Sequence, residues 1–213
     1  MIRNAHQLDH LYQEISSAIT RPIQLYVIGG AALLHRGLKE VTKDIDVVVS
    51  TREEFIHLQH VLATNNFITK SPTNVYKNMN LSEIYVRDDY RIDIFAERVC
   101  GKFSLSKEMQ QRAETIYEYD MLTVHICSNE DILLFKSMTE REGDIDDCIE
   151  IAKTTPDWTI IIDELKAQAS SGEQVWITWV AERLDLLAEK GVYIPILKEL
   201  HKLVDDYYDS LRP

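Results

Sequence analysis

The stretch that decides the fold lies at residues 26–49 and reads YVIGGAALLHRGLKEVTKDIDVVV. The apolar run that opens it is typical of a short strand, which ends at Gly29 and Gly30. Residues 31–38 are good helix formers, and residues 44–49 are a β-branched run that predicts a second strand. Glycines at a strand-to-helix turn let backbone N–H groups approach a phosphate closely, although a plain tight turn is the alternative explanation.

Asp44 and Asp46 lie two residues apart in the second predicted strand. Residues i and i+2 of a strand point to the same face, so both carboxylates project together while Ile45 and Val47 face the core. Two such carboxylates, about 7 Å apart, are costly among apolar residues unless a cation joins them. Oxygen ligands of this kind favour Mg²⁺ or Mn²⁺, whereas an edge-strand pair would simply face water. Asp93 supplies a third acid in the same apolar alternation.

Short strands alternate with helices through the rest of the first half. Thr51 and Glu54 form a capping-box pattern, which predicts that a helix begins there. Turn residues separate the later strands, and we expect Asp88 and Asp89 to form a hairpin turn. The expected helices are residues 4–19, 52–64 and 106–114, the expected strands are 83–87, 90–95, 115–119 and 122–127, and further turns are expected at 72–74 and 78–82.

Every segment after Ser128 has a helical pattern. Gly143 predicts a bend between two helices, and Pro156 occupies what we expect to be the first position of a helix. The expected helices are residues 130–140, 145–153, 156–169, 174–190 and 195–211. The sequence therefore predicts an α+β fold, with a mixed sheet flanked by helices in a domain at residues 1–128 and a helical C-terminal bundle at residues 129–213.

Charge is distributed unevenly between the two halves of the 213-residue chain. Residues 1–119 carry 14 Lys and Arg against 15 Asp and Glu, a net charge of −1. Residues 120–213 carry 9 against 20, a net charge of −11. Because an acidic surface repels phosphate backbones, we expect no binding of extended duplex DNA, and any nucleic acid should approach the first half.

The chain is expected to be cytoplasmic and to have no membrane partner. It contains no apolar run of about 20 residues, the length needed to cross a bilayer. Its amphipathic N-terminus carries Asp9 and Glu14, which fits neither a signal peptide nor a transit peptide. Cys100, Cys127 and Cys148 show no C-x-x-C spacing, which is typical of buried thiols in a reducing cytosol and argues against disulfides and a cysteine-built zinc site.

Four features together resemble the nucleotidyltransferase superfamily of the DNA polymerase beta type. They are the glycine pair, the helix after it, the D-h-D pattern on one strand and the h-D-h pattern on a later strand, where h is an apolar residue. The TKDID motif at residues 42–46, followed by Lys136, Arg141 and Asp144, is most similar to its small prokaryotic branch, which includes the AbiEii-like toxins. The resemblance covers about residues 25–140. Many relatives have Gly-Ser where this chain has Gly-Gly, so phosphate contact here would come from backbone N–H groups.

The resemblance implies a role for each acid. Asp44 and Asp46 would hold the Mg²⁺ or Mn²⁺ ions that bind the triphosphate of an NTP, and Asp93 would join the second metal and help deprotonate the attacking hydroxyl. For Lys136 and Arg141 in the helical half, an ordinary solvated helix face with ion pairs between residues four apart is an equally good explanation. The nucleotide-binding residues implied are Gly29, Gly30, Thr42, Lys43, Lys136 and Arg141.

The function that this resemblance implies is metal-dependent nucleotidyl transfer. An NMP would move from an NTP to a hydroxyl of a compact acceptor, such as an RNA end (a tRNA 3′ end in particular), a protein side chain or a small molecule, within a toxin–antitoxin pair. A non-catalytic nucleotide- or partner-binding module on the same fold is the alternative, although the presence of all three acids favours catalysis. A metal-dependent nuclease could use the same acids but leaves Gly29 and Gly30 unexplained.

Overall fold

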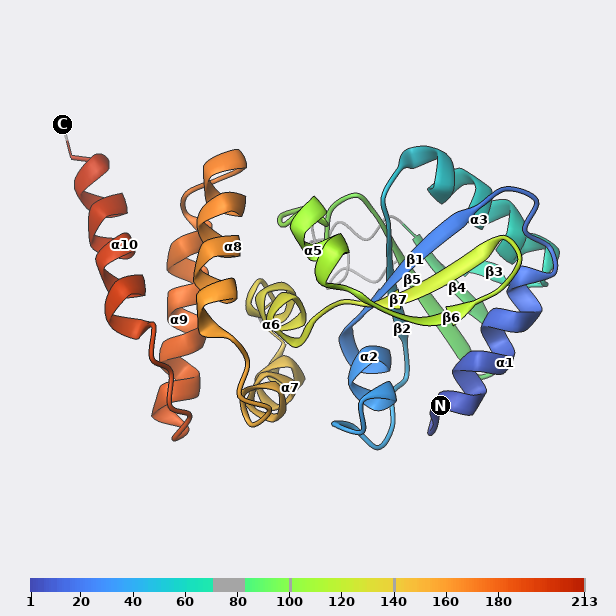
Figure 1. The fold of residues 1–213 in the computed structure, drawn as a ribbon, viewed down its shortest axis with the longest axis horizontal. Coiled ribbons are helices and arrows are strands. Elements are labelled where there is room, and N and C mark those ends of the chain that lie inside the picture. The colour runs from blue at the N-terminus through green and yellow to red at the C-terminus, as the bar shows by residue number, and fades with distance from the viewer. Residues whose placement is uncertain (71–82, 100, 140, 213) are drawn as a thin grey trace. The chain divides into compact units, whose positions relative to one another are not determined.

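A mixed sheet forms the centre of the first half of the chain in the computed structural model, which describes residues 1–70, 83–99, 101–139 and 141–212 (Figure 1). Within those ranges it has seven strands: β1 (Ile23–Ile28), β2 (Ile45–Val49), β3 (Ile68–Lys70), β4 (Glu83–Arg87), β5 (Tyr90–Ala96), β6 (Glu114–Glu118) and β7 (Leu122–Ile126). Their spatial order is β3-β4-β5-β2-β1-β7-β6. The pairs β1–β7 and β2–β5 are parallel and the other neighbours are antiparallel, which confirms the predicted α+β mixed sheet.

Helices α1 (Ala5–Ser16), α2 (Gly29–His35), α3 (Arg52–Thr64) and α5 (Lys107–Arg112) accompany the sheet. The predicted capping box is confirmed, since the Thr51 hydroxyl accepts from the Glu54 N–H and the Glu54 carboxylate accepts from the Thr51 N–H. Because this box sets where α3 begins, the helix places Phe55 and Leu58 in the core against β1, β2 and β5.

The alternation of apolar and polar residues predicts the buried side of the central strands correctly. Ile45 and Val47 on β2 are buried, as are Ile92 and Ile94 on β5. The expected hairpin is also confirmed, with β4 and β5 antiparallel across a turn in which Asp88 has a positive φ of 51°. Aspartate tolerates this left-handed conformation better than most residues, so the turn is compatible with its sequence. The turns expected at residues 72–74 and 78–82 lie outside the described residues.

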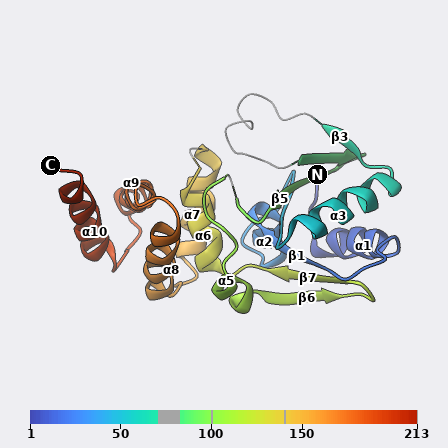
Figure 2. The same cartoon turned by 90° about the horizontal axis from the view of Figure 1, so that it is seen from above.

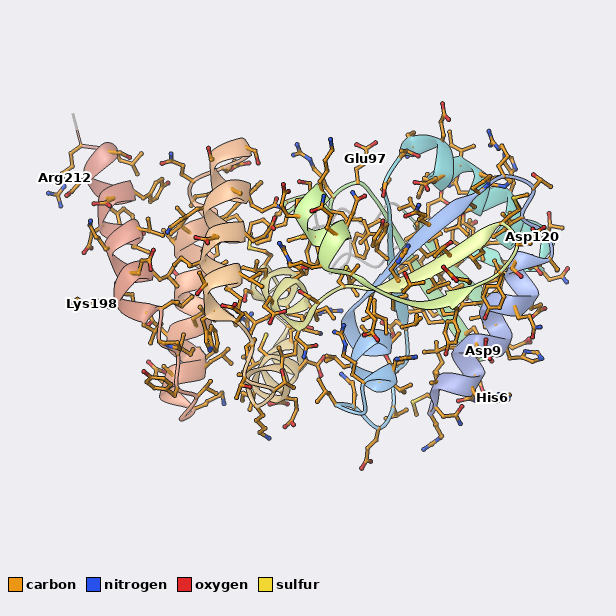
Figure 3. All side chains as sticks on the ribbon, viewed as in Figure 1. His6, Asp9, Glu97, Asp120, Lys198 and Arg212 are labelled. Carbon is orange, nitrogen blue, oxygen red and sulfur yellow. The ribbon has the colours of Figure 1, made fainter. Side chains whose placement is uncertain are left out.

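The second half of the chain is helical, with α6 (Asn129–Ser137), α7 (Glu142–Ala152), α8 (Trp158–Ser171), α9 (Trp176–Glu189) and α10 (Leu197–Ser210). Helices α8, α9 and α10 follow one another side by side in both views (Figures 1 and 2). On α10 only Leu200 is buried, and the labelled Lys198 and Arg212 lie on or just beyond that helix (Figure 3). Most of its side chains are therefore in contact with solvent.

The helix boundaries predicted at Gly143 and Pro156 differ in the structure. Gly143 lies inside the first turn of α7 rather than in a bend before it; α6 ends at Ser137, and α7 begins at Glu142. First-turn N–H groups have no intrahelical partner, so the conformational cost of glycine is tolerated there. Pro156 lies before α8 instead of inside it, because Asp157 is the N-cap and its carboxylate accepts from the Thr159 N–H at 2.9 Å.

The chain divides into two compact units, Met1–Ser128 and Asn129–Pro213. We refer to them as the sheet unit and the helical unit. Within the described ranges, no helix is both long and apolar enough to cross a membrane. Cys127 and Cys148 are buried free thiols, whereas Cys100 lies outside the described residues.

Candidate active site

Asp46 and Asp93 lie directly opposite each other on two neighbouring strands. The parallel register of β2 and β5 pairs Asp46 with Asp93, between the buried pairs that Ile45 and Val47 form. Residues paired in register project from the same face of a sheet, and Asp44 precedes Asp46 by two residues. We call Asp44, Asp46 and Asp93 the acid face of the sheet unit. The strand register therefore places Asp46 and Asp93 on one face. Asp44 lies just before β2, which begins at Ile45 instead of at the predicted residue 44, and its place on the same face stays a prediction.

The glycine turn lies against the acid face. Gly29 has a positive φ of 68°, and a Cβ atom at this position would collide with the Asp46 carboxylate. A Cβ at Gly30 would come to 2.5 Å from the Thr42 hydroxyl oxygen. Ile28, the last residue of β1, pairs with Asp46, so the turn that follows it must lie close to the acid. Glycine is required at residue 29 both for its backbone conformation and for this close approach.

Thr42 and Lys43 have different environments. Thr42 is buried, its hydroxyl donates to the backbone carbonyl of Asp44 at 3.0 Å, and its backbone exchanges two 3.0 Å hydrogen bonds with Ile2. Lys43 is exposed. Thr42 therefore supports the chain just before β2, and the expected nucleotide contacts of Thr42 and Lys43 stay predictions.

Arg91 contributes a cation to the acid face. Its guanidinium donates to both carboxylate oxygens of Asp93, with Nε–Oδ1 at 2.7 Å and Nη2–Oδ2 at 2.6 Å. The distance from Nη1 to Oδ2 of Asp44 is 3.9 Å. Asp93 is 2% exposed, and the bidentate contact with Arg91 balances its buried charge. One arginine thus contacts two of the three acids.

The donor chemistry of the acid face suits a hard divalent cation, because all three side chains are carboxylates. The Arg91 guanidinium already provides one positive charge there. Over the described part of the chain, no three His, Cys, Asp or Glu side chains are placed closely enough to hold a metal ion together. Asp46 and Asp93 share one face, the described residues do not gather the three acids into a single ligand set, and the metal-binding roles of all three stay predictions.

Lys136 and Arg141 come together inside the helical unit. Lys136 Nζ lies 2.8 Å from Asp144 Oδ1 and 2.7 Å from Asp147 Oδ2, so it joins α6 to α7. Arg141 Nε lies 2.8 Å from Asp144 Oδ2. We call Lys136, Arg141, Asp144 and Asp147 the helical cluster. The solvated-face explanation is wrong for Lys136, which is 5% exposed, and the proposed triphosphate contact of either residue stays a prediction.

The pKa values of the helical cluster follow from its charges. Burial by itself lowers the pKa of Lys136, but Asp144 and Asp147 outweigh burial and raise that pKa above its ordinary value. Burial also raises the pKa of Asp144, and Lys136 and Arg141 more than reverse this effect, leaving a pKa of about 2. Lys136 and Asp144 are therefore both ionised at neutral pH.

Arg91 and Arg183 make contacts that the sequence analysis did not predict. Arg91 precedes Asp93 by two residues, and this strand spacing was the signal that both lie on one face. Arg183 on α9 is buried, and its Nη2 donates to the backbone carbonyl of Thr139. No short-range pattern links Arg183 to residue 139, so only the packing of the helical unit reveals this contact.

Two cavities in the described residues lie away from the predicted site residues. One, of about 570 Å³, belongs to the helical unit and is lined by Trp158, Lys190 and Tyr193 among others. The other, of about 550 Å³, belongs to the sheet unit and is lined by Glu14 and Arg87 among others. Neither is lined by an acid-face residue or by a glycine of the turn.

The solved structures that match this chain do so at low sequence identity. The solved structures that are similar include ANT(2″)-Ia in complex with adenylyl-2″-tobramycin, at 16% identity, with 85% of this chain and 98% of that chain covered and a TM-score of 0.43. A candidate nucleotidyltransferase from H. pylori matches at 17% identity, with 93% and 97% covered and a TM-score of 0.44. At such values these likenesses do not establish a shared substrate. No curated protein matches the chain.

A protein-family model gives the decisive comparison. The model described as "Nucleotidyltransferase of unknown function (DUF6036)" matches residues 6–171, which is well over half of the 213-residue chain. The match includes the glycine turn, the acid face and the helical cluster. The resemblance to the nucleotidyltransferase superfamily is confirmed, and the chain belongs to this nucleotidyltransferase family.

Proposed function

We propose that this protein is a metal-dependent enzyme that moves an NMP from an NTP to a hydroxyl group of a compact acceptor. Family membership supplies the class of reaction, nucleotidyl transfer. The observation that carries the rest of the proposal is the register of β2 and β5, which sets Asp46 opposite Asp93. Gly29 brings the backbone against the same Asp46 carboxylate, as a site for a close-lying phosphate requires.

Asp44, Asp46 and Asp93 are the residues that would hold Mg²⁺ or Mn²⁺. When bound, such an ion neutralises charge on the triphosphate and on the leaving pyrophosphate. Gly29 and Gly30 would contribute backbone N–H groups to the nucleotide phosphates. This division of work matches nucleotidyl transfer, in which positioning and charge stabilisation supply most of the catalysis.

The proposed reaction is a single displacement at the α-phosphorus of the NTP. The acceptor hydroxyl oxygen forms a bond to that phosphorus, and the bond from phosphorus to the α,β-bridging oxygen breaks. Pyrophosphate leaves with the electron pair of the broken bond. Asp93 accepts the proton of the acceptor hydroxyl, which requires that one of its oxygens be released by Arg91.

Lys136 and Arg141 are proposed to serve the triphosphate in unequal ways. Arg141 has a side chain that is 39% exposed, so its guanidinium can reach a ligand while it remains near Asp144. Lys136 is almost fully buried between Asp144 and Asp147, so its contribution would be to hold those carboxylates. Thr42 would support the strand, and the exposed Lys43 would contact the outer phosphates.

The charge distribution favours a compact acceptor. Residues 120–213 carry a net charge of −11, which opposes a long phosphate track, whereas residues 1–119 are close to neutral. A tRNA 3′ end or a protein hydroxyl presents few phosphates, so these are the acceptors that we propose. The AbiEii-like sequence pattern extends the proposal to a role as the toxin of a toxin–antitoxin pair.

A non-catalytic nucleotide-binding module is the second candidate. The observation that favours it is the bidentate contact of Arg91 with Asp93, because a permanent contact would keep the third acid from accepting a proton. Turnover separates the two candidates, since only an enzyme releases pyrophosphate.

The test is to incubate the protein with Mg²⁺ or Mn²⁺ and each α-labelled NTP, with total RNA in one arm and cell lysate in the other. Pyrophosphate release and label on RNA or protein are measured. Asp46→Asn is the informative variant, because it keeps the shape of the side chain and removes its charge. Asp88→Asn is the matched control, since the Asp88 side chain is 87% exposed at a hairpin turn.

The wild-type protein and Asp88→Asn should release pyrophosphate and label an acceptor, and Asp46→Asn should do neither. Nucleotide binding without pyrophosphate release in any arm would favour the binding module. Equal activity of Asp46→Asn and wild type would remove the acid face from the mechanism. Tight, salt-sensitive binding to long duplex DNA would contradict the compact acceptor.

A further inference from the structure

We propose that Arg91 is a positioning residue that serves as the internal counter-cation of the acid face. It holds Asp93 and Asp44 in the metal-free protein and competes with a divalent metal for Asp93. This inference rests on the proposed function, because it assumes that the acid face binds metal. It also makes a claim of its own, that Asp93 has a built-in counter-charge before any ligand arrives.

The geometry carries the first part of the proposal. Both carboxylate oxygens of Asp93 accept from the guanidinium, at 2.7 and 2.6 Å, and the third guanidinium nitrogen lies 3.9 Å from Asp44. Arg91 precedes Asp93 by two residues on β5, so strand alternation places both on one face. Asp44 and Arg91 each precede the paired residues Ile45 and Ile92 by one position, which sets them across from each other.

Burial makes this contact necessary for the metal-free protein. Asp93 is 2% exposed, and a buried carboxylate without a paired charge is strongly unfavourable. The Arg91 side chain is 25% exposed, whereas that of Asp93 is 3% exposed, so the arginine is the partner with access to solvent. Arg91 can therefore leave Asp93 by moving toward water, and the buried partner remains in place.

The same contact opposes metal binding. A divalent ion on either oxygen of Asp93 would lie close to a guanidinium that is held 2.6–2.7 Å from those oxygens, and like charges at this range repel. Metal entry must therefore displace Arg91 or distort the pair. The apparent metal affinity is then reduced by the fraction of molecules in which Arg91 occupies Asp93.

Stability without metal and affinity for metal should consequently change in opposite directions when Arg91 is replaced. Arg91→Gln should lower the Tm of the metal-free protein by at least about 4 °C, because Asp93 loses its counter-charge. The same variant should bind Mn²⁺ about tenfold more tightly, since a charge-assisted hydrogen bond no longer competes. An arginine with only a structural role would lower stability and leave metal affinity unchanged or weaker.

The experiment measures Tm with and without metal and titrates Mn²⁺ alone and Mg²⁺ alone into the full chain by calorimetry. Arg87→Gln is the matched control, because Arg87 makes an equivalent bidentate contact with Glu14, at 2.8 and 2.7 Å, on the strand next to β5. It should lose stability without any change in metal affinity. Arg91→Lys keeps the charge without the bidentate fork, so its Tm and affinity should lie between those of wild type and Arg91→Gln.

A double-mutant cycle with Asp93→Asn separates this inference from the proposed function. If Arg91 neutralises Asp93, Arg91→Gln should lower the Tm much less in the Asp93→Asn background. Unchanged or weaker Mn²⁺ binding by Arg91→Gln would overturn the competition, and an additive cycle would overturn the counter-cation role. If no variant binds metal, the metal role of the acid face fails, and the cycle still decides whether Arg91 holds Asp93.

Discussion

The Arg91–Asp93 pair of the acid face and the Lys136 pairs of the helical cluster use the same chemistry and differ in their access to solvent. In the helical cluster, Lys136 is closed off with Asp144 and Asp147 between two helices. On the acid face, the Arg91 side chain is partly exposed while it holds the buried Asp93. An ion pair sealed from water is a structural element, whereas one with an exposed partner can be exchanged for a ligand.

An aspartate–cation contact therefore does not by itself indicate a ligand site. Both regions lie within the part of the chain that matches the nucleotidyltransferase family model, and the sequence offered candidate site residues in both. Exposure separates the Lys136 pairs from the Arg91–Asp93 pair, because a nucleotide or metal must displace one of the partners. Four experiments test that separation, in order of decreasing expected effect.

The largest effect is expected on the acid face. Asp46→Ala should reduce nucleotidyl transfer by about a thousandfold and abolish metal-dependent nucleotide binding, because the ligand opposite Asp93 is lost. The fold should persist, which far-UV circular dichroism would check. Binding is measured as the rise in Tm on adding Mg²⁺ with each NTP. Full stabilisation of this variant would place the metal elsewhere.

The next largest effect is expected in the helical cluster. Lys136→Met should destabilise the protein by about 3–5 kcal/mol, because two buried carboxylates lose their counter-charge. Urea denaturation measures this change. Lys153→Met is the control, since Lys153 pairs with Glu150 on the exposed surface at 2.6 Å and should contribute at most about 1 kcal/mol. Equal effects of the two variants would show that the cluster is not sealed.

A pH titration sharpens the same contrast. The pKa of Asp144 is depressed to about 2 in the folded protein, below its ordinary value of 3.8. The resulting stability is present above the unfolded pKa and is lost as pH falls from about 4 through 2, for a total of about 2 kcal/mol. Urea midpoints across this range should fall more steeply for the wild type than for Asp144→Asn. Parallel curves of urea midpoint against pH for the two proteins would contradict the lowered pKa of Asp144.

The smallest effect concerns the glycine turn. Gly29→Ala should be about 1 kcal/mol more destabilising than Gly37→Ala, because both residues have positive φ but only Gly29 would also collide with the Asp46 carboxylate. A Cβ at Gly37 would meet no atom within 4 Å, so this control isolates the backbone strain. Gly29→Ala should also weaken NTP binding. Identical losses of stability in the two variants would show that the close approach of Gly29 to Asp46 adds no cost.

The sequence by itself determined the features that depend on near neighbours in the chain. Strand alternation predicted that Asp44 and Asp46 share a face, and this follows from the period of two residues in any extended chain. The capping box at Thr51 and Glu54 needs only three residues of separation, so it was visible without a structure. The glycine pair and the three acids also sufficed for the superfamily resemblance, which the family match confirms.

Only the tertiary structure decided the features that join distant segments. The pairing of Asp46 with Asp93 requires β2 and β5 to be neighbours, and the β3–β4 strand pair between them in sequence lies on the far side of β5. Likewise, Lys136 is buried because α6 packs against α7, which brings Asp147 to its ammonium group. Propensity and periodicity describe one segment at a time, whereas burial and strand order depend on how all segments pack together.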